Sequence, residues 1–305
     1  MKSKAIIKLL ENPIFKSLYI LATYVCAIIP DGIYLRILYR VRMGEKLNLN
    51  NPVTFNEKMQ WLKIYQKKND HSYMTDKARV RDYIEKKIGK EYLIDTVGIY
   101  DSYEDIKFED LPDEFVVKCT HDSGSVILCN SKEDLIRNKN KLKKALKRKY
   151  YLAGREYSYK GITPRLIIEK KLTNDPDKGL RDYKFYCFNG EPTYLYISEG
   201  LLKHSTARIS FYNIDYSLAD FCRSDYPRLD YLPEKPVNYE KMLDICKILS
   251  EGNPFVRVDL YEVDGKIYFS ELTFSPCGGY MPFEPKEYDR ILGEKLILPR
   301  KKGKK

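Results

Sequence analysis

The segment from Phe255 to Thr273 constrains the fold most, because its pattern is typical of two β-strands joined by a turn at Asp264-Gly265. Side chains alternate between the two faces of a strand, so the length of the turn decides which residues of the two strands share a face. The polar positions in question are Arg257 and Asp259 on the first strand and Glu271 and Thr273 on the second.

Two turn lengths give opposite arrangements of these side chains. A two-residue turn would pair Val263 with Lys266, and Asp259 and Glu271 would then point to opposite faces. A three-residue turn, with its glycine left-handed in a bulge, would instead pair Glu262 with Lys266. We expect this second register, because it gathers all four polar side chains on one face and leaves the valine and leucine positions to pack on a core.

In the expected register Arg257 lies opposite Glu271, and Asp259 lies opposite Phe269. Two carboxylates, a hydroxyl and a guanidinium on one face resemble a magnesium–phosphate site, because hard cations take oxygen ligands. The same residues also fit a solvent-exposed face with an ordinary cross-strand ion pair. The segment alone leaves both interpretations open.

Composition narrows the class of protein. A chain of 305 residues that is 43% hydrophobic and 32% charged can form one large globular domain or two small ones. Its seven cysteines form no Cys-x-x-Cys pair and it has three histidines, which argues against a disulfide framework or a zinc site and for a reducing compartment. The net charge of +11 favours anionic partners such as nucleotides, acidic glycans, nucleic acid or an anionic membrane.

The apolar stretch 17–29 bears on location. It is shorter than the roughly 20 residues that a spanning helix needs, and no small-residue cleavage site follows it. We therefore expect a buried or interfacial helix and a cytoplasmic protein, in which peripheral contact with the inner face of the cell membrane would be supported by the basic surface. No recognition helix or stacking platform indicates nucleic-acid binding.

The order of predicted elements indicates an α+β fold. Helices are expected over 3–45, from a Thr54–Glu57 capping box to Gln66, and over 75–87, 131–148 and 239–250. Strands are expected over 91–100, 115–119, 126–129, 165–172, 182–188 and 193–198, besides the hairpin, and 205–236 is expected to be rich in loops.

Four features occur in order along the chain. They are Asp76-Lys77 opening a helix, Lys118 near a strand end followed by the loop His121–Ser125, the segment Ile167–Leu172, and the hairpin. This order, with the stretches 51–61, 111–118, 182–185, 257–261 and 268–274, resembles the ATP-grasp superfamily, and more closely the teichuronopeptide-biosynthesis (TupA)-like ATP-grasp proteins of bacterial polysaccharide loci. The resemblance covers about residues 30–298.

The resemblance implies a fold in which two β-rich subdomains enclose a nucleotide, after an N-terminal helical extension. The implied division is 1–50 for the helical region, 51–298 for the ATP-grasp domain and 299–305 for a basic tail. Lys77 and Lys118 would bind phosphates, with surface lysines as the alternative. The remaining nucleotide contacts would be Ser123, Gly124 and Ser125 in the loop, Glu169, Lys170 and Leu172 at the adenine, and Asp182.

By the same resemblance Asp259, Glu271 and Thr273 would hold magnesium, and Arg257 would stabilise the transferring phosphoryl group. Many ATP-grasp enzymes carry asparagine where this chain has Thr273, which leaves the coordination of a second metal ion in doubt. Lys184 is a candidate phosphate or substrate contact, or a partner in a cross-strand ion pair. His121 could be a general base for an incoming amine, or a residue that only hydrogen bonds within its loop.

These expectations describe an ATP- and magnesium-dependent carboxylate–amine ligase that modifies a precursor of a surface polysaccharide such as a capsule. Its substrates would be an acidic glycan, for example a uronic acid, and an amino acid. Two alternatives stay open: a non-catalytic binding protein with this fold, and a glycosyltransferase of the same pathway. The glycosyltransferase has only Asp175-Pro-Asp177 in its favour, which also fits a simple turn.

Overall fold

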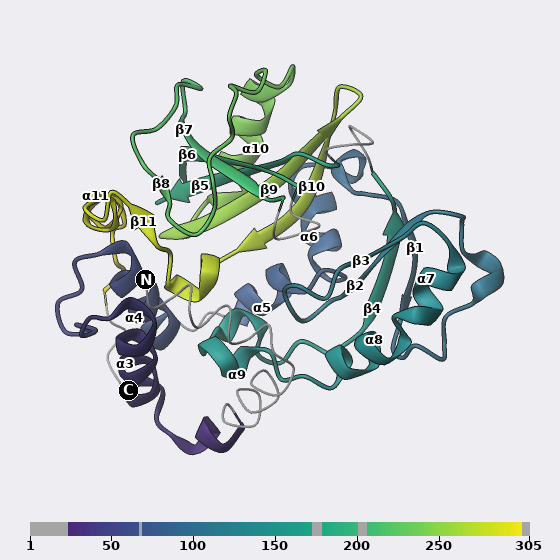
Figure 1. Ribbon diagram of the computed structural model, residues 1–305, viewed down its shortest axis with the longest axis horizontal. Coiled ribbons are helices and arrows are strands. Elements are labelled where there is room, and N and C mark those ends of the chain that lie inside the picture. The colour runs from purple at the N-terminus through teal and green to yellow at the C-terminus, as the bar shows by residue number, and fades with distance from the viewer. Residues whose placement is uncertain (1–23, 67–68, 173–178, 201–205, 301–305) are drawn as a thin grey trace.

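The computed structural model describes residues 24–66, 69–172, 179–200 and 206–300. The expected helix over 3–23, most of the apolar stretch 17–29, Asp175-Pro-Asp177 and most of the basic tail lie outside these ranges. Two antiparallel sheets dominate the described part (Figure 1). Each sheet is covered on one face by helices, which is the layered arrangement of an α+β protein.

Sheet A has four strands in the order β1-β4-β2-β3. Its apolar face packs under the helices α7 (Lys132–Arg137) and α8 (Lys139–Leu146), with Phe115, Val117 and Ile168 fully buried there. The strands are β1 (Thr96–Tyr100), β2 (Phe115–Cys119), β3 (Ile127–Cys129) and β4 (Leu166–Lys170).

Sheet B has five strands in the order β10-β9-β5-β6-β7, and a two-stranded ribbon of β11 and β8 lies beside it. The five strands are β5 (Asp182–Phe188), β6 (Glu191–Glu199), β7 (Arg208–Asn213), β9 (Phe255–Val263) and β10 (Lys266–Thr273). The ribbon strands are β8 (Cys222–Arg223) and β11 (Phe283–Glu284). β7 is a full strand inside the segment that was expected to be loop-rich.

Nine α-helices and five 3-10 helices occur within the described ranges. The α-helices are α3 (Asp31–Met43), α4 (Phe55–Tyr65), α5 (Asn69–Thr75), α6 (Val80–Lys87), α7 (Lys132–Arg137), α8 (Lys139–Leu146), α9 (Tyr151–Gly154), α10 (Tyr239–Ser250) and α11 (Tyr288–Lys295). The 3-10 helices are η1 (Cys26–Ile28), η2 (Lys90–Tyr92), η3 (Phe108–Asp110), η4 (Tyr157–Tyr159) and η5 (Pro276–Gly279).

Local sequence explains where these helices begin and break. The Thr54 hydroxyl accepts from the backbone N–H of Glu57, and the Glu57 carboxylate accepts from that of Thr54. This reciprocal cap, which the sequence predicted, contributes about 1 kcal/mol to α4. The single helix expected over 75–87 is wrong, because the Asp76 carboxylate accepts from the N–H of Ala78 and forms a turn between α5 and α6.

The helix expected over 131–148 is also interrupted. It consists of α7 and α8, which meet at Asn138. Both the backbone N–H and the side chain of Asn138 donate to the carbonyl of Asp134, one turn before it. The segment 147–159, which contains α9, follows α8. In Figure 1, α9 lies between α3 on one side and the two sheets on the other.

The two faces of sheet B differ, and this difference positions the site. Val256, Val258 and Leu260 of β9 pack on one face with α10. The opposite face begins as an aromatic core in which Phe55 of α4 contacts the rings of Tyr186 and Phe255. Farther along β9 the same face carries the charged side chains of Arg257 and Asp259, which therefore lie next to the aromatic core.

α3 shares this aromatic core. Tyr34, Leu35 and Tyr39 are buried against residues of α4, β5 and β11. The N-terminal helical region thus packs on the domain that follows, and the boundary at residue 50 stays a prediction.

Candidate active site

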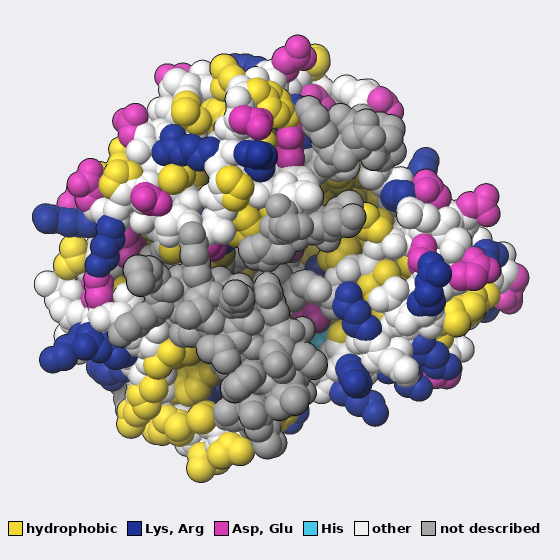
Figure 2. Space-filling view, in the orientation of Figure 1, with side chains coloured by type: hydrophobic (Ala, Val, Ile, Leu, Met, Phe, Trp, Pro, Cys, Tyr) yellow, Lys and Arg dark blue, Asp and Glu magenta, His cyan; other side chains and the backbone are white. Residues whose placement is uncertain are grey.

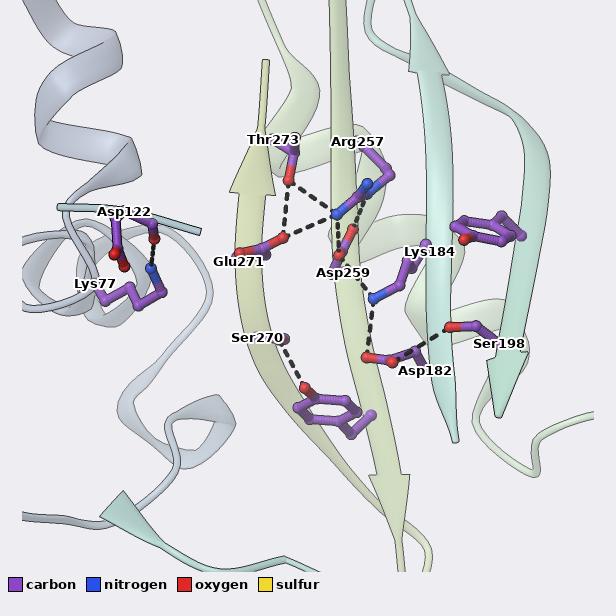
Figure 3. A network of polar contacts seen from close by, with 12 residues as sticks. Lys77, Asp122, Asp182, Lys184, Ser198, Arg257, Asp259, Ser270, Glu271 and Thr273 are labelled. Carbon is purple, nitrogen blue, oxygen red and sulfur yellow. Dashed lines mark hydrogen bonds and ion pairs between the residues drawn. The ribbon is translucent and has the colours of Figure 1, made fainter. Parts of the chain in front are cut away.

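The polar half of sheet B carries six interacting side chains (Figure 3). They are Arg257 and Asp259 from β9, Glu271 and Thr273 from β10, and Asp182 and Lys184 from β5. The strand pairing brings them together, because Lys184 is opposite Asp259 in the ladder and Asp259 is opposite Glu271. All six were predicted as site residues.

The predicted register of the hairpin is wrong, although the predicted face is correct. Val263 pairs with Lys266 across a two-residue turn, in which Asp264 and Gly265 both have positive φ. Such a turn matches the twist of the strands. A bulge between Phe269 and Glu271 then adds one residue to β10 and returns Glu271 to the face of Asp259.

Arg257 is the centre of the hairpin's polar face. Its Nε and Nη2 atoms each lie 2.6 Å from an oxygen of Asp259, a bidentate pair. Nη2 also lies 2.8 Å from Glu271 Oε1 and 3.0 Å from Thr273 Oγ1. Three oxygens from three side chains therefore converge on one nitrogen.

Lys184 links this cluster to the next strand. Its Nζ lies 3.1 Å from Asp259 Oδ2 and 2.9 Å from Asp182 Oδ1, so the cross-strand ion pair that the sequence allowed is present. The hydroxyl of Ser198 on β6 donates to the second oxygen of Asp182. The network alternates in charge along the sheet, and this arrangement satisfies its buried charges.

The pKa values of two carboxyl groups in the network, those of Asp259 and Glu271, are shifted in opposite directions. Burial raises the pKa of Asp259, although Arg257 and Lys184 act against it. Burial alone would also raise the pKa of Glu271, but Arg257, Lys77 and Lys184 outweigh it and hold that pKa at about 2. Glu271 is thus ionised at neutral pH, with about a third of its side chain exposed toward the cavity described below.

Sheet A presents a matching ion pair. Lys118 Nζ lies 2.7 Å from Glu169 Oε2, and Arg81 of α6 lies 3.5 Å from the other oxygen. Burial raises the pKa of Tyr261 on β9 and Asp182 adds to the effect, whereas Lys118 and Lys184 lower it.

The loop after β2 lies at the edge of this space. Lys77 donates to the carbonyl of Asp122, and its charge lowers the pKa of Glu271 on sheet B. Ser123 and Gly124 are exposed, and Gly124 has a φ of +92° that suits glycine. The Ser125 hydroxyl is buried and bonded to the Asp122 carboxylate, so the loop is held in place from within.

Three other predicted residues lie apart from the network. The His121 ring is buried and its Nε2 faces the carbonyl of Arg148 at 3.2 Å; burial lowers its pKa. The backbone N–H of Lys170 donates to the carbonyl of Asp95, so it is engaged within sheet A, and Leu172 follows the strand end half-buried. Their proposed roles as a base and as adenine contacts stay predictions.

A cavity of about 560 Å³ opens beside Arg257, Glu271 and Thr273. This volume lies within the roughly 300–1,000 Å³ typical of ligand sites. Ser123 lines it, but most of its wall comes from residues that the sequence did not single out: Arg42, Arg148, Tyr150, Glu156, Tyr159, Arg223, Asp225 and Tyr280. They come from α3, η4, β8 and loops, so no single strand or helix pattern groups them.

The predicted metal ligands suit a hard cation in their chemistry. Asp259, Glu271 and Thr273 offer oxygens only, and these oxygens already surround the cationic nitrogen of Arg257. Within the described ranges, no group of three His, Cys, Asp or Glu side chains gathers to bind a metal. The set therefore fits one magnesium ion whose third protein ligand is a hydroxyl.

Comparison with known proteins gives the family. The family model described as "TupA-like ATPgrasp" matches residues 57–297. No curated protein matches the sequence. Among solved structures, the ATP complex of D-alanine–D-alanine ligase from Bacillus anthracis is 15% identical with a TM-score of 0.43, and the match covers 66% of this chain and 55% of that one.

Two other solved structures are similar at the same level. A RimK-domain ATP-grasp protein from Sphaerobacter thermophilus is 8% identical, with a TM-score of 0.41 and coverage of 81% of this chain and 72% of that one. The ATP-grasp ligase PsnB, complexed with a phosphomimetic variant of its minimal precursor, Mg and ADP, is 9% identical, with a TM-score of 0.40 and coverage of 72% and 58%. The chain spans little more than half the length of the D-alanine–D-alanine ligase it matches.

The family model covers most of the chain, and it agrees with two antiparallel sheets and a hairpin that carries Asp259 and Glu271. The chain belongs to the TupA-like ATP-grasp family.

Proposed function

We propose that this protein is an ATP-dependent carboxylate–amine ligase. The observation that carries the proposal is the convergence of Asp259, Glu271 and Thr273 on one cationic point, with a large cavity beside them. In a phosphoryl transfer the protein mainly positions the reactants and neutralises charge. A rigid sheet that fixes two carboxylates, a guanidinium and a lysine within hydrogen-bond distance is suited to that task.

Each part of the site has a role in this proposal. Lys118 on sheet A and Lys184 on sheet B would bind the phosphates from two sides. Asp259, Glu271 and Thr273 would hold magnesium, which when bound neutralises charge on the phosphates. Arg257 would stabilise the group in transfer, since its guanidinium lies at the boundary between the network and the cavity. The ligase would pass through an acyl-phosphate, with ADP as product.

The acceptors that we propose are a carboxylate and an amine on a precursor of a bacterial surface polysaccharide. A uronic acid joined to an amino acid would suit a basic protein of net charge +11. The arginines that line the cavity, among them Arg42 and Arg148, support an acidic acceptor.

The test is ADP release in the presence of magnesium and paired acceptors. We expect release only when both a uronic acid and an amine are present, and we expect an amide-linked product by mass spectrometry. The proposal would be wrong if no pair of acceptors led to ADP release and ATP did not bind. A preference for nucleotide sugars over ATP would favour the glycosyltransferase alternative.

We also propose peripheral contact of α3 with an anionic membrane. Within the described ranges no helix is both long and apolar enough to cross a bilayer. Ile33, Ile37 and Val41 follow one another at helical spacing on α3, and each is at least half exposed. Arg36 and Arg40 flank them, and Figure 2 shows hydrophobic side chains gathered at the lower edge of the molecule, where Figure 1 draws α3.

Replacing Ile37 by glutamate should weaken binding to vesicles that contain anionic lipid. The change removes apolar area and adds repulsion at the centre of the stripe, so we expect at least a tenfold loss, about 1.4 kcal/mol. Co-sedimentation with phosphatidylglycerol vesicles measures it. Ile248→Glu, at an exposed position on α10, is the matched control. Equal binding by both variants and the unchanged protein would remove α3 from the proposal.

A further inference from the structure

Most charged side chains that line the cavity already have partners. Arg257 is held by Asp259 and Glu271. Arg223 donates to both oxygens of Asp225, at 2.9 and 2.7 Å. Arg223 and Asp225 neutralise each other, and the two carboxylates around Arg257 outweigh its single positive charge.

Glu156 differs from these pairs. It follows α9 and lines the cavity, and its carboxylate makes no hydrogen bond or ion pair with any residue that the structure describes. Lys63 lies near it, but that ammonium donates to Gln60 and to the carbonyls of Gly154 and Gly278. Burial raises the pKa of Glu156, with Lys63 and Arg42 acting against it. A half-buried carboxylate of this kind has room to accept hydrogen bonds from a ligand.

Arg148 lines the same cavity as Glu156 and carries the opposite charge. Its guanidinium carbon lies 5.1 Å from the centroid of the Tyr150 ring. It makes no ion pair with any acidic residue in the described ranges. A cation that rests on an aromatic face can still bind an anion at its edge.

Two tyrosines, Tyr150 and Tyr159, line the cavity together with Glu156 and Arg148. Both Glu156 and Arg148 act on the pKa of Tyr150, which burial raises. The ring of Tyr150 meets that of Tyr159 edge-on at 4.7 Å. Burial also raises the pKa of Tyr159, on which Glu271, Glu156 and Arg257 act as well. Glu156, Arg148 and both tyrosines line the same cavity as Arg257 and Glu271.

We infer that Glu156 and Arg148 bind the amine substrate, and that this substrate is a free amino acid. Glu156 would accept hydrogen bonds from its ammonium group, and Arg148 would pair with its carboxylate. A zwitterion is the ligand class that satisfies one unpartnered anion and one unpartnered cation in the same cavity. The inference rests on the proposed ligase function and adds to it the two residues that would hold the amino acid.

The chemistry balances with the proposed reaction. The acceptor carboxylate attacks the γ-phosphorus of ATP, and ADP leaves. The ammonium of the amino acid gives one proton to Glu156, and the freed nitrogen attacks the acyl carbon. The C–N bond forms as the C–O bond to phosphate breaks, and phosphate leaves with that electron pair. The second proton of the nitrogen leaves to water.

Calorimetric titration of the full chain with the twenty standard amino acids, in the presence of ATP and magnesium, tests the inference. We expect at least one to bind. Its N-acetyl derivative, which lacks the ammonium, and its carboxamide, which lacks the carboxylate, should each bind at least tenfold more weakly. Binding of none of the twenty would overturn the inference.

Two variants then assign the contacts. Glu156→Gln should bind the amino acid at least tenfold more weakly and no longer distinguish it from the N-acetyl derivative. Arg148→Gln should no longer distinguish it from the carboxamide, and Arg148→Lys should restore part of that selectivity. Glu104→Gln and Arg137→Gln, on exposed ion pairs outside the cavity, are the matched controls. Unchanged selectivity in Glu156→Gln or in Arg148→Gln would contradict the assignment of that residue.

The same titrations separate this inference from the proposed function. If ATP binds with magnesium and no amino acid does, the amino-acid site is wrong and the ligase proposal stands. If ATP itself fails to bind, the ligase proposal fails. Melting temperatures of the variants within a few degrees of the unchanged protein would exclude loss of fold as the cause.

Discussion

Asp259→Asn should lower the free energy of unfolding by about 3–5 kcal/mol, the range for breaking a buried ion pair from one side. Asp259 is fully buried, and it receives both contacts of the Arg257 guanidinium and one from Lys184. Asparagine keeps the size but leaves two buried cations with less compensation. Urea unfolding at neutral pH measures the change.

The same variant should also lose ADP release by at least about a hundredfold, because it removes a proposed metal ligand and loosens Arg257. Assays below the melting temperature keep the two effects apart. Asp230→Asn, whose carboxylate forms an exposed pair with Arg208 at 3.6 Å, is the control and should change neither quantity by much. An Asp259→Asn variant with unchanged stability would contradict the ion-pair network, and one with full activity would remove Asp259 from the metal site.

Lys118→Met should weaken ATP binding by about 10- to 100-fold, as expected for the loss of one hydrogen bond between charged groups worth about 1.5–3 kcal/mol. Lys118 is a half-buried cation on sheet A, and burial lowers its pKa while Glu169, together with Tyr261 and Glu271, raises it well above its ordinary value. It thus stays charged in the site. Calorimetry with ATP and magnesium measures the loss.

Stability should change less than affinity in this variant, because Arg81 remains 3.5 Å from Glu169 and still compensates its charge. Lys143→Met, which breaks an exposed pair with Glu104, is the matched control for a lysine removed from an ion pair. If both variants bind ATP as the unchanged protein does, Lys118 is not a phosphate contact.

The sequence predicted the bounds of an element most accurately where one hydrophobic periodicity dominated the segment. The strands β2 and β5 and the helix α10 have their predicted bounds, since each is a short apolar or amphipathic run with clear ends. The shared face of Arg257, Asp259, Glu271 and Thr273 was also predicted. It was reached through the wrong register, because a bulge inside β10 carries no sequence signal comparable to Asp-Gly in a turn.

The elements and site residues that the sequence did not predict have a common physical origin. β7 lies among loops and is a strand because it pairs with β6, a long-range contact that local pattern does not reveal. The turn at Asp76 and the break at Asn138 depend on side-chain bonds that compete with a helix. The cavity gathers Arg148, Glu156 and their neighbours from irregular segments, where only the tertiary structure brings residues together.

The most direct test of the proposed ATP–magnesium site is calorimetric titration with ATP, with and without magnesium, on the unchanged protein and on Glu271→Gln. Glutamine keeps the hydrogen-bonding size of Glu271 but removes the charge that Arg257 and Lys77 stabilise. We predict that magnesium tightens ATP binding at least tenfold, about 1.4 kcal/mol, in the unchanged protein and hardly at all in the variant. ATP binding that is absent, or equal with and without magnesium in both proteins, would contradict the assignment.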